Sequence, residues 1–159
     1  NLMALREVNV GQVMTPRTVV FSFRADQTVE EATRGRPPRF ARIPLVGESP
    51  DDVKGQVHRH QLFRALGEGR GDAKLAEFAK PLHVVPELAK LSAVLKTFIE
   101  RREHIFWVVD EFGGYVGIVT LEDVIETLLG VEIVDETDSV EDMRALAREM
   151  ARRRRAEHQ

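Results

Sequence analysis

The sequence VVDEFGGYVGIVTLEDVIETLLG, residues 108–130, predicts a strand, a tight turn, a second strand and a helix in immediate succession. The turn is predicted at residues 110–114, because its two glycines can adopt the positive φ angles that hairpin turns require. Residues 115–119 are largely apolar and β-branched, which predicts the return strand. Apolar residues at helical spacing then predict a helix that ends at Gly130.

Thr120 and Asp123, where the return strand meets the helix, support two interpretations. A Thr followed three residues later by an acid is a helix N-capping signature. The same pair can also bind a ligand, because helix N-termini favour anions such as phosphate and a carboxylate can accept hydrogen bonds from ribose hydroxyls. Capping and ligand binding do not exclude each other, so both interpretations stay open.

Length and composition limit the possible functions. A chain of 159 residues, 43% hydrophobic and 31% charged, predicts one globular domain or two small units that share a core. The absence of cysteine excludes disulfides and thiolate metal sites, and a formal net charge of −3 argues against nucleic-acid partners. No apolar run approaches the roughly 18 residues that cross a bilayer. Because the sequence begins with Asn1, we expect a fragment of a longer protein.

The two halves of the sequence repeat each other. Pro16 corresponds to Pro81, and Gly55 corresponds to Gly117, at offsets of roughly 60 residues. Each half predicts the order β-α-β-β-α, with the first strand at residues 18–23 in the first half. One half is too small to bury a good core alone. We therefore expect the halves to pair about a pseudo-two-fold axis, with two equivalent clefts between them.

The expected boundaries follow from glycine content and charge. Three glycines fall within residues 67–72, which predicts the break between the halves. The last part of the chain is acidic and is then predicted to form an amphipathic helix from Ser139. The helix ends in four arginines, which are expected either to lie in solvent or to contact anionic lipid or a partner. The predicted divisions are a lead-in helix at 1–8, a first unit at 9–67, a linker at 68–79, a second unit at 80–131, and an acidic linker with a basic helical tail at 132–159.

Five segments carry a family resemblance: VMTPRTVVF (13–21), RIPL (42–45), GQVHRHQL (55–62), the stretch 108–130, and EIVDETD (132–138). They resemble a tandem cystathionine-β-synthase (CBS) domain pair, also called a Bateman module. More narrowly, they are similar to the pair of the CorC/HlyC and CNNM-type divalent-cation transporter group.

The resemblance implies an α+β fold of two β-α-β-β-α CBS units with a C-terminal helical tail. It implies a regulatory, non-enzymatic role in which an adenine nucleotide (ATP, or AMP or ADP), with Mg²⁺, binds in the cleft between the units. It also implies a homodimer on the cytoplasmic face of the cell membrane, beside the transmembrane domain of a magnesium or cobalt exporter.

The family's G-x-h-[ST]-x-x-D motif, where h is apolar, matches Gly117, Thr120 and Asp123. At the equivalent positions of the first half stand His58 and Gln61, and a neutral Gln makes weaker hydrogen bonds than a carboxylate. We therefore expect one competent nucleotide site and one degraded site.

The expected fold also predicts further residues that line the nucleotide cleft. An apolar slot for an adenine ring is expected from Val84, Val85 and Phe106, and a phosphate contact from Arg42 or Arg102. The alternative for each is an ordinary core or surface position.

Other functions have weaker sequence support. His58 and His60 lack a third ligand, so we expect no metal site on the protein. The chain shows no nucleophile–base pair and no P-loop, so we expect no catalytic residues. A module that dimerises or binds partners without a ligand remains the alternative function.

Overall fold

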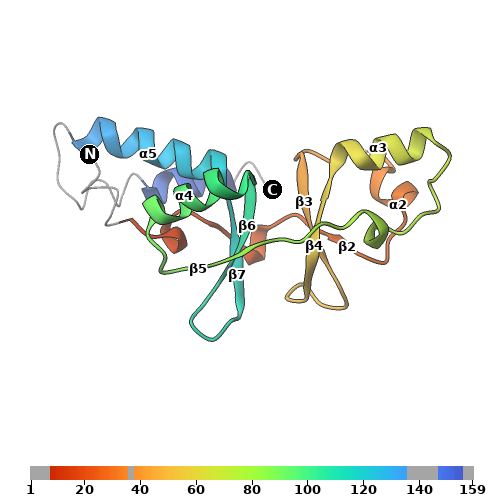
Figure 1. Ribbon diagram of the computed structural model, residues 1–159, viewed down its shortest axis with the longest axis horizontal. Coiled ribbons are helices and arrows are strands. Elements are labelled where there is room, and N and C mark those ends of the chain that lie inside the picture. The colour runs from red at the N-terminus through yellow and green to blue at the C-terminus, as the bar shows by residue number, and fades with distance from the viewer. Residues whose placement is uncertain (1–7, 36–37, 136–146, 156–159) are drawn as a thin grey trace. The chain divides into compact units, whose positions relative to one another are not determined.

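Two β-α-β-β-α repeats follow each other in the computed structural model (Figure 1), which describes residues 8–35, 38–135 and 147–155. The predicted α+β class is confirmed. The chain divides into two compact units: unit 1 comprises Asn1–Val20 and His83–Gln159, and unit 2 comprises Phe21–Leu82. Each unit is described by itself.

Unit 2 contains a three-stranded sheet in the order β2-β3-β4. Its strands are β2 (Phe23–Arg24), parallel to β3 (Arg42–Val46), which pairs antiparallel with β4 (Val53–His58). The helices are α2 (Val29–Thr33), α3 (Arg59–Gly67) and the short η3 (Leu75–Phe78). Thr28 caps α2 by accepting from the N–H of Glu31 at 3.1 Å, as expected for a Thr before an acidic first turn.

Unit 1 contains a four-stranded sheet in the order β1-β7-β6-β5. Its strands are β1 (Thr15–Pro16), β5 (Val84–Pro86), β6 (Ile105–Val109) and β7 (Tyr115–Thr120). The helical segments are η1 (Val10–Gln12), η2 (Arg17–Val19), α4 (Leu91–Arg101), α5 (Leu121–Asp135) and a C-terminal helix at residues 147–155. The hairpin predicted within residues 108–130 and the start of the helix that follows it are thus confirmed.

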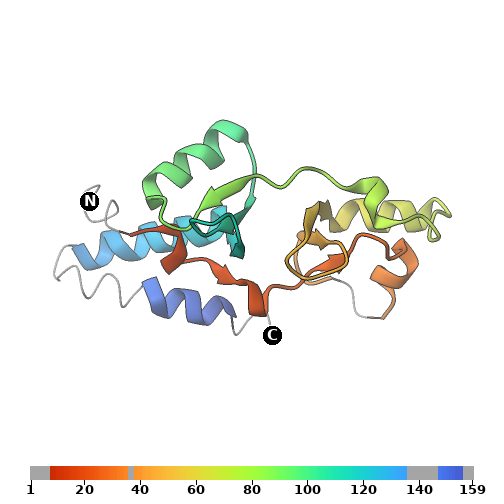
Figure 2. The ribbon, with the colours of Figure 1, turned by 90° about the horizontal axis from the view of Figure 1, so that it is seen from below.

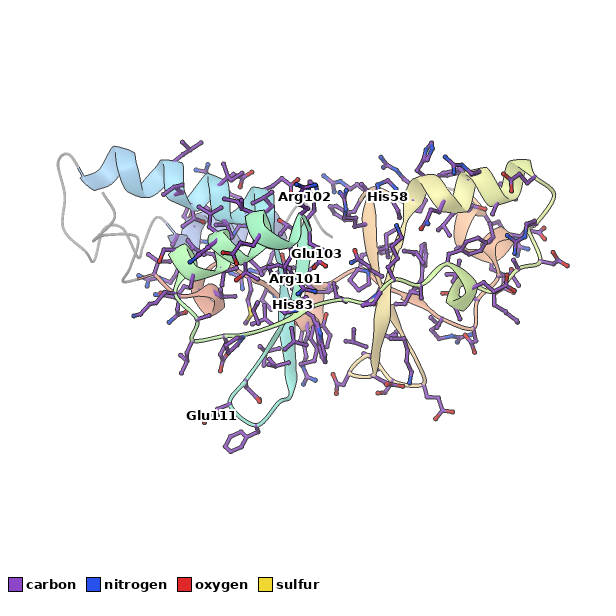
Figure 3. All side chains as sticks on the ribbon, in the orientation of Figure 1. His58, His83, Arg101, Arg102, Glu103 and Glu111 are labelled. Atoms are coloured by element: carbon purple, nitrogen blue, oxygen red, sulfur yellow. The ribbon has the colours of Figure 1, made fainter. Side chains whose placement is uncertain are left out.

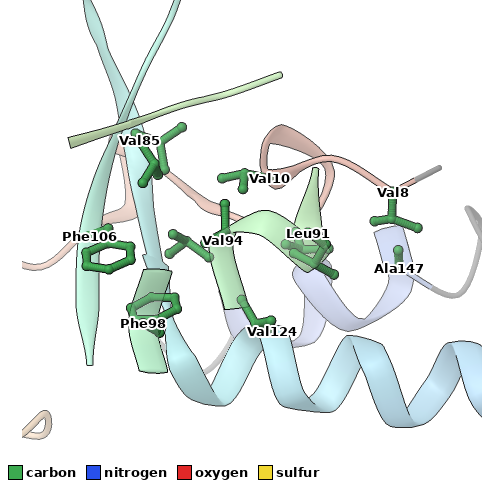
Figure 4. Packing of buried hydrophobic residues seen from close by; sticks show 12 residues of the cluster. Val8, Val10, Val85, Leu91, Val94, Phe98, Phe106, Val124 and Ala147 are labelled. Atoms are coloured by element: carbon green, nitrogen blue, oxygen red, sulfur yellow. The ribbon is translucent and has the colours of Figure 1, made fainter. Parts of the chain in front are cut away.

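The core of unit 1 includes two stacked phenylalanines (Figure 4). The rings of Phe98 on α4 and Phe106 on β6 lie parallel, with centroids 3.9 Å apart. Val124 of α5 belongs to the same buried cluster, and so does Ala147 of the C-terminal helix. The C-terminal helix is therefore part of the fold of unit 1.

The lead-in segment of each sequence repeat pairs with the hairpin of the other repeat. Thr15 and Pro16 precede the first repeat, yet they pair with Ile118 and Gly117 of β7. Lys80 precedes the second repeat, yet it forms an antiparallel bridge with Gln56 of β4. This exchange explains why the compact units divide differently from the predicted boundaries at 9–67 and 80–131.

Gly55 and Gly117 occupy equivalent strands, as the repeat predicts. Gly55 pairs with Leu45 and Gly117 with Val108, and in both hairpins the register shifts at the next pair. Each glycine also faces the backbone of the incoming lead-in segment, so that a side chain at either position would meet a carbonyl group. The two glycines permit this close approach.

Two local predictions are wrong. Residues 18–23 were expected to form a strand, but η2 replaces its first part because the chain leaves unit 1 and enters unit 2 at this point. The helix expected to end at Gly130 continues to Asp135, because one interior glycine costs only about 1 kcal/mol. The lead-in helix at residues 1–7 and the tail between 136 and 146 lie outside the described residues. Across the described part of the chain, no helix is long and apolar enough to cross a membrane.

Candidate functional site

Thr120 and Asp123 form a reciprocal capping box at the start of α5. The Thr120 hydroxyl accepts from the Asp123 N–H at 3.2 Å, and Asp123 Oδ2 accepts from the Thr120 N–H at 3.3 Å. The capping interpretation is therefore confirmed. The pair also places a buried carboxylate, with 6% of its side chain exposed, at a helix N-terminus.

Arg154 of the C-terminal helix reaches the same carboxylate. Its Nε lies 2.7 Å from Asp123 Oδ1, and both side chains are 6% exposed. Its Nη2 donates to the carbonyl oxygen of Val13, and its Nη1 lies 3.3 Å from Glu126 Oε2. Asp123 is thus bound on one oxygen by its own cap and on the other by an arginine.

The charge state of Asp123 reflects opposing effects. Burial raises the pKa of the Asp123 carboxyl, because an ionised group loses hydration there. The Arg154 guanidinium and the hydrogen bonds from Thr120 act in the opposite direction but do not cancel the effect of burial. The ionised carboxylate therefore depends on a close positive or hydrogen-bonding partner.

The first repeat has the same cap made from neutral side chains. His58 Nδ1 accepts from the His60 N–H at 3.0 Å, and the Gln61 side-chain oxygen accepts from the His58 N–H at 3.4 Å. His58 and Gln61 therefore keep the geometry of Thr120 and Asp123 without the negative charge. That the first-repeat motif is the weaker ligand site stays a prediction.

Because only a neutral imidazole can accept at Nδ1, the α3 cap should weaken at low pH. Partial burial, and then the charge of Arg42, lower the pKa of His58. The cap should make its full contribution to the free energy of unfolding above the pKa of His58 in the unfolded chain, about 6.5. That contribution should be lost as the pH falls through the lower pKa of His58 in the folded chain. His58→Ser keeps a cap that does not titrate.

Thermal unfolding at pH 8 and pH 5 measures this effect. We expect the wild-type midpoint to fall by about 2–4 °C more than that of His58→Ser, which corresponds to a cap worth about 1 kcal/mol. The comparison between variants removes the titration of all other groups. Equal shifts in the two proteins would show that His58 protonation does not matter for α3.

The structure separates the residues predicted for an adenine slot. Val85 and Phe106 belong to the core of unit 1, and the Phe106 ring is stacked on Phe98 and has His83 at its edge. Neither offers a free face to a base in this conformation. Val84, which is 39% exposed, is the member of the slot with surface available.

The arginines predicted for phosphate lie in different units. Arg42 begins β3 of unit 2, where it pairs with His58 in the register of the sheet. Arg102 is the C-cap of α4 in unit 1, with a left-handed φ of 54°, and its side chain is exposed (Figure 3). Neither contacts Asp123 in the interactions described, so their role toward phosphate stays a prediction.

A cavity of about 690 Å³ lies beside the C-terminal helix in unit 1. One face of that helix and the N-terminal segment around η1 and β1 line the cavity, and Figure 2 shows the two segments near each other. The lining residues are Gly11, Gln12, Met14, Pro16, Arg148, Ala151, Arg152 and Arg155. The described residues contain no group of three or more His, Asp or Glu side chains placed to bind a metal.

Arg154 is the site residue that the sequence interpretation missed. Four consecutive arginines at 152–155 were read as an end in solvent or at a surface, yet Arg154 is buried. The available signal is the spacing of Ala147, Ala151 and Arg154, which places two small buried residues and the arginine on one helix face. Small residues on that face allow the helix to approach close enough for the arginine to reach Asp123.

Comparison with known proteins adds three findings. The family model described as CBS domain matches residues 75–130. The magnesium and cobalt efflux protein CorC of Vibrio cholerae is 35% identical over 153 residues, which cover 92% of this chain and 51% of that protein. The CBS domain of the bacterial CNNM/CorC family Mg²⁺ transporter, solved in complex with ATP, has a TM-score of 0.75 at 34% identity and covers 81% of this chain and 92% of that one.

A second solved structure contains a different nucleotide. The CBS-domain pair with bound AMP from Klebsiella pneumoniae has a TM-score of 0.68 at 27% identity, covering 77% of this chain and 98% of that one. The present chain spans about half the length of the curated relatives it matches.

Proposed function

This chain belongs to the CNNM/CorC family as its CBS-domain module, and on that premise we propose that it is a regulatory module that binds an adenine nucleotide. ATP is the first candidate, since the similar CNNM/CorC structure was solved with ATP and the similar Klebsiella pneumoniae pair with AMP. The regulated protein is proposed to be a magnesium or cobalt exporter, with this module on the cytoplasmic face of the membrane beside its transmembrane domain.

The buried Asp123 carboxylate at the N-terminus of α5 is the observation that carries the proposal. A carboxylate can accept hydrogen bonds from two adjacent ribose hydroxyls, and hydrogen bonds to a charged acceptor are stronger than neutral ones. Thr120 and the α5 N-terminus are suited to phosphate, because free N–H groups and the helix dipole favour an anion. Gly117 brings β7 against β1 and so fixes the start of α5.

The remaining predicted contacts enter the proposal with unequal support. Val84 has exposed surface for a base, and Arg42 and Arg102 supply positive charge. Val85 and Phe106 would contribute only after rearrangement of the core. Mg²⁺ is proposed to arrive on the nucleotide phosphates, since it usually binds through substrate phosphates and few protein ligands.

A homodimer is part of the proposal, because helices of both units expose apolar side chains that a partner would cover. These are Phe63 and Leu66 on α3, Ile99 on α4, and Ile125 and Leu129 on α5. The same surfaces favour the alternative function, an interaction module that works without a ligand. Sedimentation that finds only monomer at high micromolar concentration would contradict the dimer under either function.

Calorimetric titration with ATP and Mg²⁺ tests the nucleotide proposal. We expect about one nucleotide per chain, and Asp123→Ala should weaken binding by roughly 10- to 100-fold, because a hydrogen bond to a charged group contributes about 1.5–3 kcal/mol. Gln61→Ala should leave the affinity unchanged, since the first-repeat motif is neutral. Glu122→Ala is the matched control, because it removes an exposed carboxylate one residue away.

The stability of Asp123→Ala must be measured separately, because this side chain also caps α5 and pairs with Arg154. Its thermal midpoint without ligand gives that contribution. Two equal sites per chain, or an Asp123→Ala protein with wild-type affinity, would mean that the motif is a capping box only.

A further inference from the structure

Arg154 and a ribose would compete for one carboxylate. Asp123 Oδ2 accepts from the Thr120 N–H, and Oδ1 faces the Arg154 guanidinium at 2.7 Å. With the C-terminal helix in place, the Asp123 side chain is 6% exposed. A ribose therefore cannot reach this carboxylate unless the helix or the arginine moves.

The arginine is held by more than one partner. Its Nη2 donates to the Val13 carbonyl, and its Nη1 approaches Glu126, so the guanidinium contacts the N-terminal segment and α5 at once. Ala147 and Ala151, both buried, pack the same face of the helix onto unit 1. A guanidinium presents several N–H groups in one plane, so a single arginine can contact carboxylate and carbonyl oxygens together. A lysine at position 154 would not reproduce this set of contacts.

Arg152 and Arg153, which precede Arg154 in the run, lack this environment. Arg153 is 74% exposed on its side chain and contacts only Glu149 of its own helix, at 3.6 Å, among the ion pairs described. Arg152 likewise pairs with Glu149. The run therefore combines the buried Arg154 with two exposed arginines at 152 and 153.

We propose that the C-terminal helix, residues 147–155, is an autoinhibitory element whose Arg154 occupies the Asp123 carboxylate and excludes adenine nucleotides. The proposal rests on the function proposed above. A nucleotide binds the state in which the helix has left Asp123, so the apparent affinity is reduced by the fraction of molecules in that open state. By reciprocity, a nucleotide on Asp123 drives the helix away from unit 1.

The test compares ATP–Mg²⁺ titrations of the full chain with those of Arg154→Gln and Arg153→Gln. Arg154→Gln removes the competing charge, and its ATP affinity should rise about tenfold or more. Arg153→Gln removes the same charge from the adjacent exposed position and should stay within about twofold of wild type. Hydrogen exchange of the wild-type chain is the second measurement, and saturating ATP should speed exchange of the amides at residues 147–155.

The outcomes separate the two proposals. If wild type and Arg154→Gln bind ATP equally, and Asp123→Ala binds more weakly, the nucleotide function stands and autoinhibition is overturned. If no variant binds ATP, the nucleotide function fails and the autoinhibition fails with it. Should Arg154→Gln not fold, the wild-type exchange decides alone: slower or unchanged exchange of residues 147–155 with bound ATP overturns the proposal.

Discussion

Phe98→Ala should lower the free energy of unfolding of unit 1 by about 3–5 kcal/mol, the cost of replacing a fully buried phenylalanine with alanine. Phe98 stacks on Phe106 within the buried cluster, so its removal leaves a cavity and also ends an aromatic contact. The thermal midpoint should fall by about 6–20 °C in circular dichroism.

Glu100→Ala is the control for this variant. It changes a residue two positions further along α4, but the Glu100 side chain is 62% exposed and should contribute less than about 0.5 kcal/mol. If the two variants unfold at the same temperature, the stacked pair does not stabilise unit 1 as expected.

Gly117→Ala should destabilise unit 1 by about 3 kcal/mol, the upper end of the usual cost of overpacking. The added Cβ would overlap the carbonyl oxygen of Thr15 and would lie 2.9 Å from Met14 Sδ. Since backbone atoms cannot rotate away as a flexible side chain can, β1 must separate from β7. The midpoint should fall by about 6–12 °C.

Gly67→Ala is the matched control, because the same substitution at this position should not lower the stability. A Cβ at Gly67 meets no atom within 4 Å, and alanine favours helix over glycine by about 1 kcal/mol. This variant should melt at or above the wild-type temperature. A Gly117→Ala protein that behaves like Gly67→Ala would show that β1 does not pair closely with β7.

Local features of the fold were predictable because they depend on a few adjacent residues. The hairpin turn at residues 110–114, the cap at Thr120, and the repeat landmark at Gly55 and Gly117 each follow from residue type and spacing. The same information predicted that the first-repeat motif, with His58 and Gln61, would lack charge.

Features that depend on distant pairing were not predictable from one sequence. The exchange of lead-in segments joins Thr15 to Ile118, and no local pattern in either region requires that partner. Arg154 and Asp123 are likewise more than 30 positions apart, and three other arginines adjoin Arg154. Phe106 was expected at a ligand wall because an aromatic residue on a buried strand suits a base as well as it suits another phenylalanine.

The exchanged lead-in segments also set an order for folding during translation. Unit 2 spans Phe21–Leu82, so all of its residues are synthesised before β7 is made. Thr15 and Pro16 emerge earlier but have no strand to pair with until β7, more than 100 residues later, has been synthesised. Pairing across such a separation is intrinsically slow. Among the described residues, β1 is thus one of the first elements to be synthesised and one of the last to fold.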